Sequence, residues 1–403
     1  MERPLAATLD LDAFTVGGIL DALPDGAYVT DRDRRILLWN RAAEQITGWK
    51  REQVIGRHCR DNILVHTDKE GRPLCGRDTC PLHRSIVTGQ RSEHPVLIFA
   101  QRANGSRVPV EASVAPLRDR SGAVVGGIEI FRDMSATIND LNTAQLIQRD
   151  ALQSVLPEDS RVLFSTHYVP HDLIGGDFFR IEPLDTERYA VLVADVTGHG
   201  VAAALYVMQI RSLWEDHRAE LGDPACFMAA LNARLHALSR PNDYFATAVL
   251  AVVNAATGRV TYVRAGHEAP LLACADGRVT KLNQSGAGLG LLPDTKYAVG
   301  EFDLQPGDSL LLYTDGAVEI TNAQGLELGT EGLMRLVGDG CLRGGGSFLV
   351  RLDEALLAYS NAIRLPDDLT LVCVQRPAAV RLILKNPRPP IPPASLPGLD
   401  VPR

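Results

Sequence analysis

The sequence predicts an α+β protein in which two folded units are joined by one helix. Three observations support this fold class. Both halves contain short apolar runs separated by Gly, Asp and Asn turns, which is typical of hairpin-linked strands. Strands and helices do not alternate regularly, so a doubly wound parallel sheet is not expected. Residues 133–156 contain neither Gly nor Pro, which favours a continuous helix between the two halves.

Length and composition restrict the class of protein further. The chain has 403 residues, which predicts two or three domains at roughly 100–200 residues each. Its 41 basic and 49 acidic side chains give a net charge of −8, so no basic surface for nucleic acid is expected. No apolar run is long enough to span a membrane, and residues 1–11 lack the apolar core of a signal peptide. We therefore expect a cytoplasmic protein with reduced thiols.

The first predicted domain covers residues 15–132. Alternating apolar residues at 26–31 and 35–39 predict an opening hairpin. Helical spacing follows at 40–49. Asn-Gly and Ser-Gly turns then separate three further predicted strands, at 95–100, 108–116 and 123–131.

This first region resembles a PAS domain. The resemblance implies a sensor that binds a small ligand or none and that commonly dimerises. It rests on the whole pattern of short matches in the hairpin, the helices and the later strands. The matching segments are Leu23-Pro-Asp-Gly26, Val29-Thr-Asp31, Trp39-Asn40, Thr47-Gly-Trp49 and Gly126-Gly-Ile-Glu-Ile130.

The centre of the PAS-like region carries Cys59, Cys75, Cys80 and His83. These four side chains are candidate ligands for zinc or an iron–sulfur cluster. Two of the thiols could instead form a redox pair. All of them are also consistent with incidental thiols in a loop, because the spacing matches none of the common zinc patterns. The three interpretations stay open, and the PAS ligand is unidentified.

The second region, residues 133–157, is predicted to be a linker helix that ends at Pro157. Its apolar residues recur at three- and four-residue steps, which forms one apolar stripe. Such a helix either packs on its own domain or serves as a connecting or dimerising helix, and its position between two domains favours the second interpretation. We therefore expect a homodimer through the PAS domain and this helix. The stripe consists of Leu141, Ala144, Leu146, Ile147, Ala151, Leu152 and Val155.

The third region, residues 160–376, places Asp residues at the ends of apolar runs or beside Gly. Asp is disfavoured within strands, so carboxylates at strand ends commonly face a shared edge. Two carboxylates 4 Å apart repel by about 4 kcal/mol at an effective dielectric of 20, and a hard divalent cation removes that penalty. Each Asp alone is consistent with a turn or cap; together they indicate a Mg²⁺ or Mn²⁺ site. They are Asp177, Asp195, Asp315, Asp367 and Asp368.

At these residues the third region resembles the bacterial SpoIIE/RsbU-like branch of the PP2C (PPM) serine/threonine phosphatases. The motifs occur in the family's order over most of the region. The resemblance implies an αββα sandwich with a two-metal centre at the edge between the sheets. The matching segments are Gly175-Gly-Asp-Phe-Phe179, Ala194-Asp-Val-Thr-Gly-His-Gly200, Phe245-Ala-Thr-Ala248, Ala265-Gly-His267, Leu289-Gly-Leu291, Pro306-Gly-Asp308, Tyr313-Thr-Asp-Gly316 and Asp367-Asp-Leu-Thr370.

The resemblance also implies site roles. Asp195 bridges two ions, Mn²⁺ or Mg²⁺, and Asp368 is a weaker candidate because the family usually uses the first Asp of the pair. Two such ions activate a water that attacks phosphorus without a covalent intermediate. Thr197 stands where eukaryotic relatives carry a His suggested as general acid. The implied metal ligands are the side chains of Asp177, Asp195, Asp315 and Asp367 and the backbone carbonyl of Val196.

The order of the regions, a sensor followed by a helix and then a phosphatase, predicts a PAS-regulated protein serine/threonine phosphatase. By analogy with the family, its substrate is a phosphorylated anti-sigma-factor antagonist in a partner-switching pathway. Two alternatives remain: a catalytically weak or inactive sensor or scaffold that binds a regulatory partner, and a phosphodiesterase or other two-metal hydrolase that acts on small molecules. Residues 377–403 are rich in Pro and are predicted to form a disordered tail.

Overall fold

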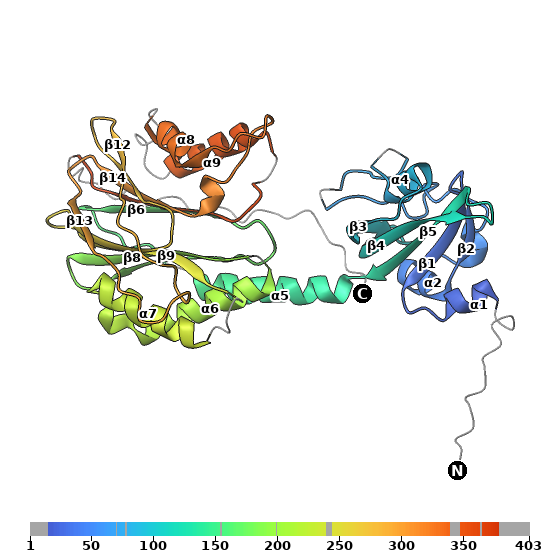
Figure 1. The fold of residues 1–403 in the computed structure, drawn as a ribbon, viewed down its shortest axis with the longest axis horizontal. Coiled ribbons are helices and arrows are strands. Elements are labelled where there is room, and N and C mark those ends of the chain that lie inside the picture. The colour runs from blue at the N-terminus through green and yellow to red at the C-terminus, as the bar shows by residue number, and fades with distance from the viewer. Residues whose placement is uncertain are drawn as a thin grey trace, which may run out of the picture. The chain divides into compact units, whose positions relative to one another are not determined.

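The chain forms two compact units, Met1–Ala144 and Gln145–Arg403, and the division falls within one helix. In Figure 1 the first unit is blue to teal and the second is green to red. Within the described residues, no helix is long and apolar enough to cross a membrane. The tail predicted at 377–403 lies outside them except for its first two positions. The computed structural model describes residues 15–69, 71–76, 79–153, 155–198, 200–238, 244–338, 347–362 and 365–378.

The first unit contains a five-stranded antiparallel sheet with strand order β2-β1-β5-β4-β3. The first and last strands of the unit pair at its centre, so its core joins residues from both of its ends. The predicted hairpin and the three later strands are all present. The elements are α1 (Val16–Asp21), β1 (Gly26–Asp31), β2 (Ile36–Trp39), α2 (Arg41–Thr47), α3 (Arg51–Val54), α4 (Pro81–Thr88), β3 (Val96–Gln101), β4 (Arg107–Arg118) and β5 (Val124–Asp133).

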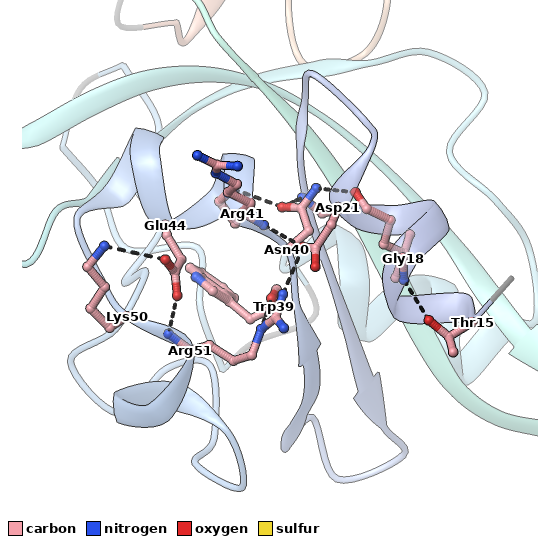
Figure 2. Close-up of polar contacts among 12 residues, drawn as sticks. Thr15, Gly18, Asp21, Trp39, Asn40, Arg41, Glu44, Lys50 and Arg51 are labelled. Atoms are coloured by element: carbon pink, nitrogen blue, oxygen red, sulfur yellow. Dashed lines mark hydrogen bonds and ion pairs between the residues drawn. The ribbon is translucent and has the colours of Figure 1, made fainter.

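Asn40 ties three elements of this unit together and starts α2 (Figure 2). Its side-chain oxygen accepts hydrogen bonds from the backbone N–H groups of Ala43 and Ala27, both at 2.8 Å. Its amide nitrogen donates to the carbonyls of Leu20 and Asp25, both at 2.9 Å. The side chain is buried, so these four bonds satisfy its amide completely while capping the helix.

The second unit contains two five-stranded sheets, ordered β13-β10-β9-β8-β7 and β12-β11-β14-β15-β6. Each pairing in both sheets is antiparallel. The elements are β6 (Leu163–Val169), β7 (Asp177–Pro183), β8 (Arg188–Val196), α6 (Val201–Asp216), α7 (Pro224–Leu238), β9 (Ala246–Asn254), β10 (Arg259–Ala265), β11 (Leu271–Ala273), β12 (Val279–Lys281), β13 (Gly300–Asp303), β14 (Ser309–Tyr313), α8 (Gly329–Leu336), α9 (Ser347–Ser360) and β15 (Leu369–Gln375).

Alternate residues of β8 belong to two different apolar layers. Val191 and Val193 pack between the sheets against residues such as Leu312. Leu192 and Ala194 face the other way and pack with α6 and α7. A third layer lies between the second sheet and the helices α8 and α9. The unit is therefore a helix–sheet–sheet–helix sandwich (Figure 1), and burial on both faces explains why β8 reads as one continuous apolar run.

Helix α5 (Ser135–Leu152) lies within the predicted linker at 133–157 but stops before Pro157. Its last turn is held by the side chain of Arg211 in α6, whose Nε donates to the carbonyl of Ala151 at 2.6 Å. The predicted apolar stripe is not buried as a whole, because Leu146 and Ile147 are 50% and 61% exposed. The helix instead buries a polar residue, Gln148.

Candidate metal centre

The four Asp side chains expected to bind metal come from two sheets. Asp177 begins β7 and stands opposite Asp195 of β8 in the antiparallel register. Asp315 begins the short 3₁₀ helix that follows β14, and Asp367 lies just before β15. Because β14 and β15 are neighbouring antiparallel strands, Asp315 and Asp367 lie at the same end of the second sheet.

Two threonines at the edge of the second sheet, Thr314 directly after β14 and Thr370 in β15, bind Asp177 of the first sheet. The hydroxyl of Thr314 donates to Oδ2 of Asp177 at 2.9 Å, and the hydroxyl of Thr370 donates to the same oxygen at 2.6 Å. All three side chains are buried. These bonds bring the carboxylate ends of both sheets to one edge. Both threonines lie in motifs that were recognised in the sequence, but no role for them could be predicted there.

The carboxyl groups at this edge raise one another's pKa. Burial and the charge of Asp195 hold the pKa of Asp177 well above its ordinary value. Burial, followed by the charges of Asp315 and Asp367, raises the pKa of Asp195 to about 8. Burial and the charge of Asp367 also raise the pKa of Asp315 to about 6. Mutual repulsion of this kind is what a bound cation would relieve.

The donor chemistry at this edge fits a metal ion of the Mg²⁺ or Mn²⁺ kind, because all the side-chain donors are carboxylate oxygens. In the part of the chain that the structure describes, no group of three or more His, Cys, Asp or Glu side chains could hold a metal ion as it stands. The four carboxylates therefore share one edge and one electrostatic field without a closed coordination shell.

Asp368 holds the backbone of the loop that precedes β7. Its Oδ1 accepts from the N–H of His171 and its Oδ2 from the N–H of Gly176, both at 2.6 Å. Gly175 is required beside it, because a Cβ there would clash with the hydroxyl of Tyr168. Since both oxygens of Asp368 are engaged by backbone N–H groups, its contacts are those of an anchor for the Gly-Gly loop.

The backbone of Val196 and Thr197 borders the same loop. The N–H of Val196 donates to the carbonyl of Gly176 at 3.1 Å, and a Cβ on Gly176 would lie 3.2 Å from the carbonyl oxygen of Val196. The hydroxyl of Thr197 donates to the carbonyl of Phe245 at 3.0 Å. This hydroxyl is therefore bound to backbone and is poorly placed to give a proton to a leaving group.

The candidate cofactor residues of the first unit are buried thiols and one helical His. Cys59 and Cys80 are buried, Cys75 is half-buried, and all three are free thiols. Burial raises the pKa of Cys75 to about 12 and raises that of Cys59 as well, which disfavours the thiolate form of both side chains near neutral pH. His83 lies in α4. A metal, cluster or redox role for these residues stays a prediction.

A buried acid, Glu129 of β5, lies among these thiols and had no signal in the sequence. The hydroxyl of Tyr28 donates to its Oε2 at 2.8 Å, and Nε2 of His66 lies 3.5 Å from its Oε1. Burial raises the pKa of Glu129 to about 7 and lowers that of His66 to about 4. A single Glu in a strand normally indicates a solvent-facing position, so the sequence could not predict its burial.

Comparison with known proteins agrees with both halves of this architecture. Residues 185–377 match the family described as Stage II sporulation protein E (SpoIIE), and residues 20–139 match the PAS fold. The chain carries a PAS domain followed by a SpoIIE-type PP2C domain. The solved SiaA-PP2C domain of Pseudomonas aeruginosa resembles it with a TM-score of 0.52 and 22% identity, over 60% of this chain and 99% of that domain. The predicted fold class and family are thus confirmed.

Two relatives of this chain come from Bacillus subtilis (strain 168). Phosphoserine phosphatase RsbP is 27% identical over 188 residues, which is 46% of this chain and 46% of RsbP. Phosphoserine phosphatase RsbU is 26% identical over 240 residues, which is 59% of this chain and 70% of RsbU. The match therefore spans about half the length of RsbP.

Proposed function

We propose that this chain is a PAS-regulated, metal-dependent protein serine/threonine phosphatase. The observation that supports it best is the pair of hydroxyl bonds from Thr314 and Thr370 to Asp177, which bring the carboxylate ends of two sheets to one edge. The match to the SpoIIE family and the two relatives named phosphoserine phosphatases support the same reaction. The inactive scaffold is the alternative that the test below must exclude.

The chemistry would depend on two divalent ions, Mn²⁺ or Mg²⁺. When bound, such ions lower the pKa of a water molecule and offset the charge of the phosphoryl oxygens. Thr314 and Thr370 keep the Asp177 carboxylate in place, and Asp368 keeps the loop before it in place. Because Thr197 donates to backbone, water is the proposed proton donor to the leaving oxygen. The ligands would be Asp177, Asp195, Asp315, Asp367 and the carbonyl of Val196.

The proposed substrate is a phosphoserine or phosphothreonine protein, by family analogy an anti-sigma-factor antagonist of a partner-switching pathway. The chain's net charge of −8 does not favour nucleic acid as a partner.

Regulation would pass from the PAS domain through α5. The exposed apolar side chains of Leu146 and Ile147 support a helix that also meets a second copy of this chain. Leu146→Pro breaks the helix at a cost of about 3 kcal/mol and is expected to make turnover insensitive to changes in the PAS domain. Leu146→Ala is the control, because it keeps the helix. Unchanged regulation in the Pro variant would contradict this route.

The test of the reaction is Mn²⁺-dependent release of phosphate from a phosphoserine protein. Asp195→Asn is expected to remove activity, because it would remove the negative charge of one of the proposed metal-binding carboxylates. Asp185→Asn is the matched control, since Asp185 lies in the turn between β7 and β8 and only accepts turn and Arg188 bonds. If the wild-type chain releases no phosphate with Mn²⁺ or Mg²⁺, the scaffold alternative replaces the phosphatase.

A further inference from the structure

Gln148 is an unusual residue to bury in a linker helix. Every residue of α5 is described, and Gln148 is the one that is buried, with 7% of its surface exposed. Its neighbours Leu146 and Ile147 are apolar and yet largely exposed. A buried primary amide is costly unless its hydrogen-bonding groups are satisfied. The partners of Gln148 should therefore explain why the helix places it inward.

Both ends of the Gln148 amide bind the backbone of one residue, Gly175. Its Nε2 donates to the carbonyl of Gly175 at 2.9 Å, and its Oε1 accepts from the N–H of Gly175 at 3.2 Å. The next N–H, that of Gly176, donates to Asp368. Two side chains from distant parts of the sequence thus hold consecutive residues, and the residue that follows them is Asp177.

The end of α5 and the residue that follows it make further contacts within the second unit, where Leu152 packs against the apolar core beneath α6 and α7. Arg211 donates to the carbonyl of Ala151, and Arg180 donates to that of Gln153 at 3.3 Å. A cavity of about 350 Å³ lies beside Gln148 and is lined by residues that include Gln145, Gly175 and Asp177. This space therefore adjoins both the helix and the loop that precedes Asp177.

We propose that Gln148 is a positioning residue through which α5 sets the backbone of Gly175 and Gly176 and thereby the metal affinity of Asp177. This inference rests on the proposed function and adds the place at which the linker acts on the site. Gln148 touches no reacting atom and acts only through Gly175. A shift or rotation of α5 would break both hydrogen bonds between the Gln148 side chain and Gly175, which makes this contact sensitive to the state of the linker.

The test compares two identical substitutions in the full-length chain. Gln148→Leu removes both bonds at nearly the same size, whereas Gln145→Leu changes a residue on the same helix and the same cavity that makes no such bond. We expect Gln148→Leu to speed amide exchange at Gly175 and Gly176 at least tenfold. We also expect it to raise the Mn²⁺ concentration for half-maximal binding at least fivefold, with the control within twofold of wild type.

The inference is overturned if Gln148→Leu and Gln145→Leu behave alike in both measurements. Gln148→Asn covers the case in which the Leu variant does not fold, because it keeps the amide but is too short to reach Gly175; it should behave like the Leu variant. A wild-type chain without Mn²⁺-dependent phosphate release would refute the proposed function, whereas amide exchange at Gly175 would still decide whether Gln148 holds the loop.

Discussion

The two domains bury acidic side chains in opposite surroundings. In the PP2C domain, Asp195 is buried beside other carboxylates, and burial together with their charge raises its pKa. In the PAS domain, Glu129 is also buried with a raised pKa, but its near neighbours are the hydroxyl of Tyr28 and the ring of His66. An acid among acids gains from a cation, whereas an acid among neutral partners can stay protonated. This difference separates a candidate metal centre from a structural core.

The largest expected effect comes from removing one carboxylate of the acidic edge. Asp367→Asn should lower Mn²⁺-dependent phosphate release by about 10²–10³-fold, because metal stabilisation of the transition state amounts to several kcal/mol. Glu129→Gln should leave the basal rate within about twofold, since that acid has no part in the proposed reaction. Steady-state rates at saturating Mn²⁺ check both variants. Equal losses of phosphate release in the two variants would contradict the distinction between a metal-binding acid and a structural one.

The second-largest expected effect is a pH dependence of the stability of the PAS domain. The pKa of Glu129 rises from 4.5 to about 7 on folding, so its stabilising contribution is complete below pH 4.5 and is lost as pH rises to 7. The pKa of His66 falls from 6.5 to about 4, so its contribution is complete above pH 6.5 and is lost as pH falls to 4. The two opposite trends should nearly cancel between about pH 4.5 and 6.5.

Single substitutions should expose each trend. In Glu129→Gln, the free energy of unfolding should fall by up to about 3 kcal/mol as pH falls from 6.5 to 4. In His66→Gln, it should fall instead as pH rises from 4.5 to 7. Urea unfolding in a Trp214→Phe background reports on the PAS domain, because Trp39 and Trp49 are then the remaining tryptophans. A flat profile in both variants would contradict the assignment.

The smallest effect concerns the bonds between the sheets. Thr370→Val removes one of the two hydroxyls that bind Asp177, and Thr314 still supplies the other. The free energy of unfolding of the PP2C domain should fall by about 1–2 kcal/mol. Mn²⁺ affinity should fall less than tenfold. Thr280→Val on β12 is the control, because its hydroxyl makes only a long contact, 3.5 Å, with Leu272. Equal stability in the two variants would show that the bond is unimportant.

The strands, the Gly turns and the Asp residues at the strand ends could be predicted from sequence, because they follow local rules. The threonine bonds could not, since Thr314 and Thr370 meet Asp177 only when two sheets stack. The burial of Gln148 could not be predicted, because an apolar stripe marks the helix face that is expected to be buried, whereas the stripe residues Leu146 and Ile147 are exposed. Contacts between distant segments, unlike local patterning, leave little trace in one sequence.

The most direct test of the central claim is calorimetric titration of Mn²⁺ into the full-length chain. Asp177→Asn removes a carboxylate from the first sheet and Asp315→Asn removes one from the edge of the second, while Asp276→Asn changes an exposed turn residue as a control. If both sheets contribute to one site, the wild type and Asp276→Asn bind Mn²⁺ alike and both other variants bind at least tenfold more weakly. Wild-type affinity in either Asp177→Asn or Asp315→Asn would contradict a shared metal centre.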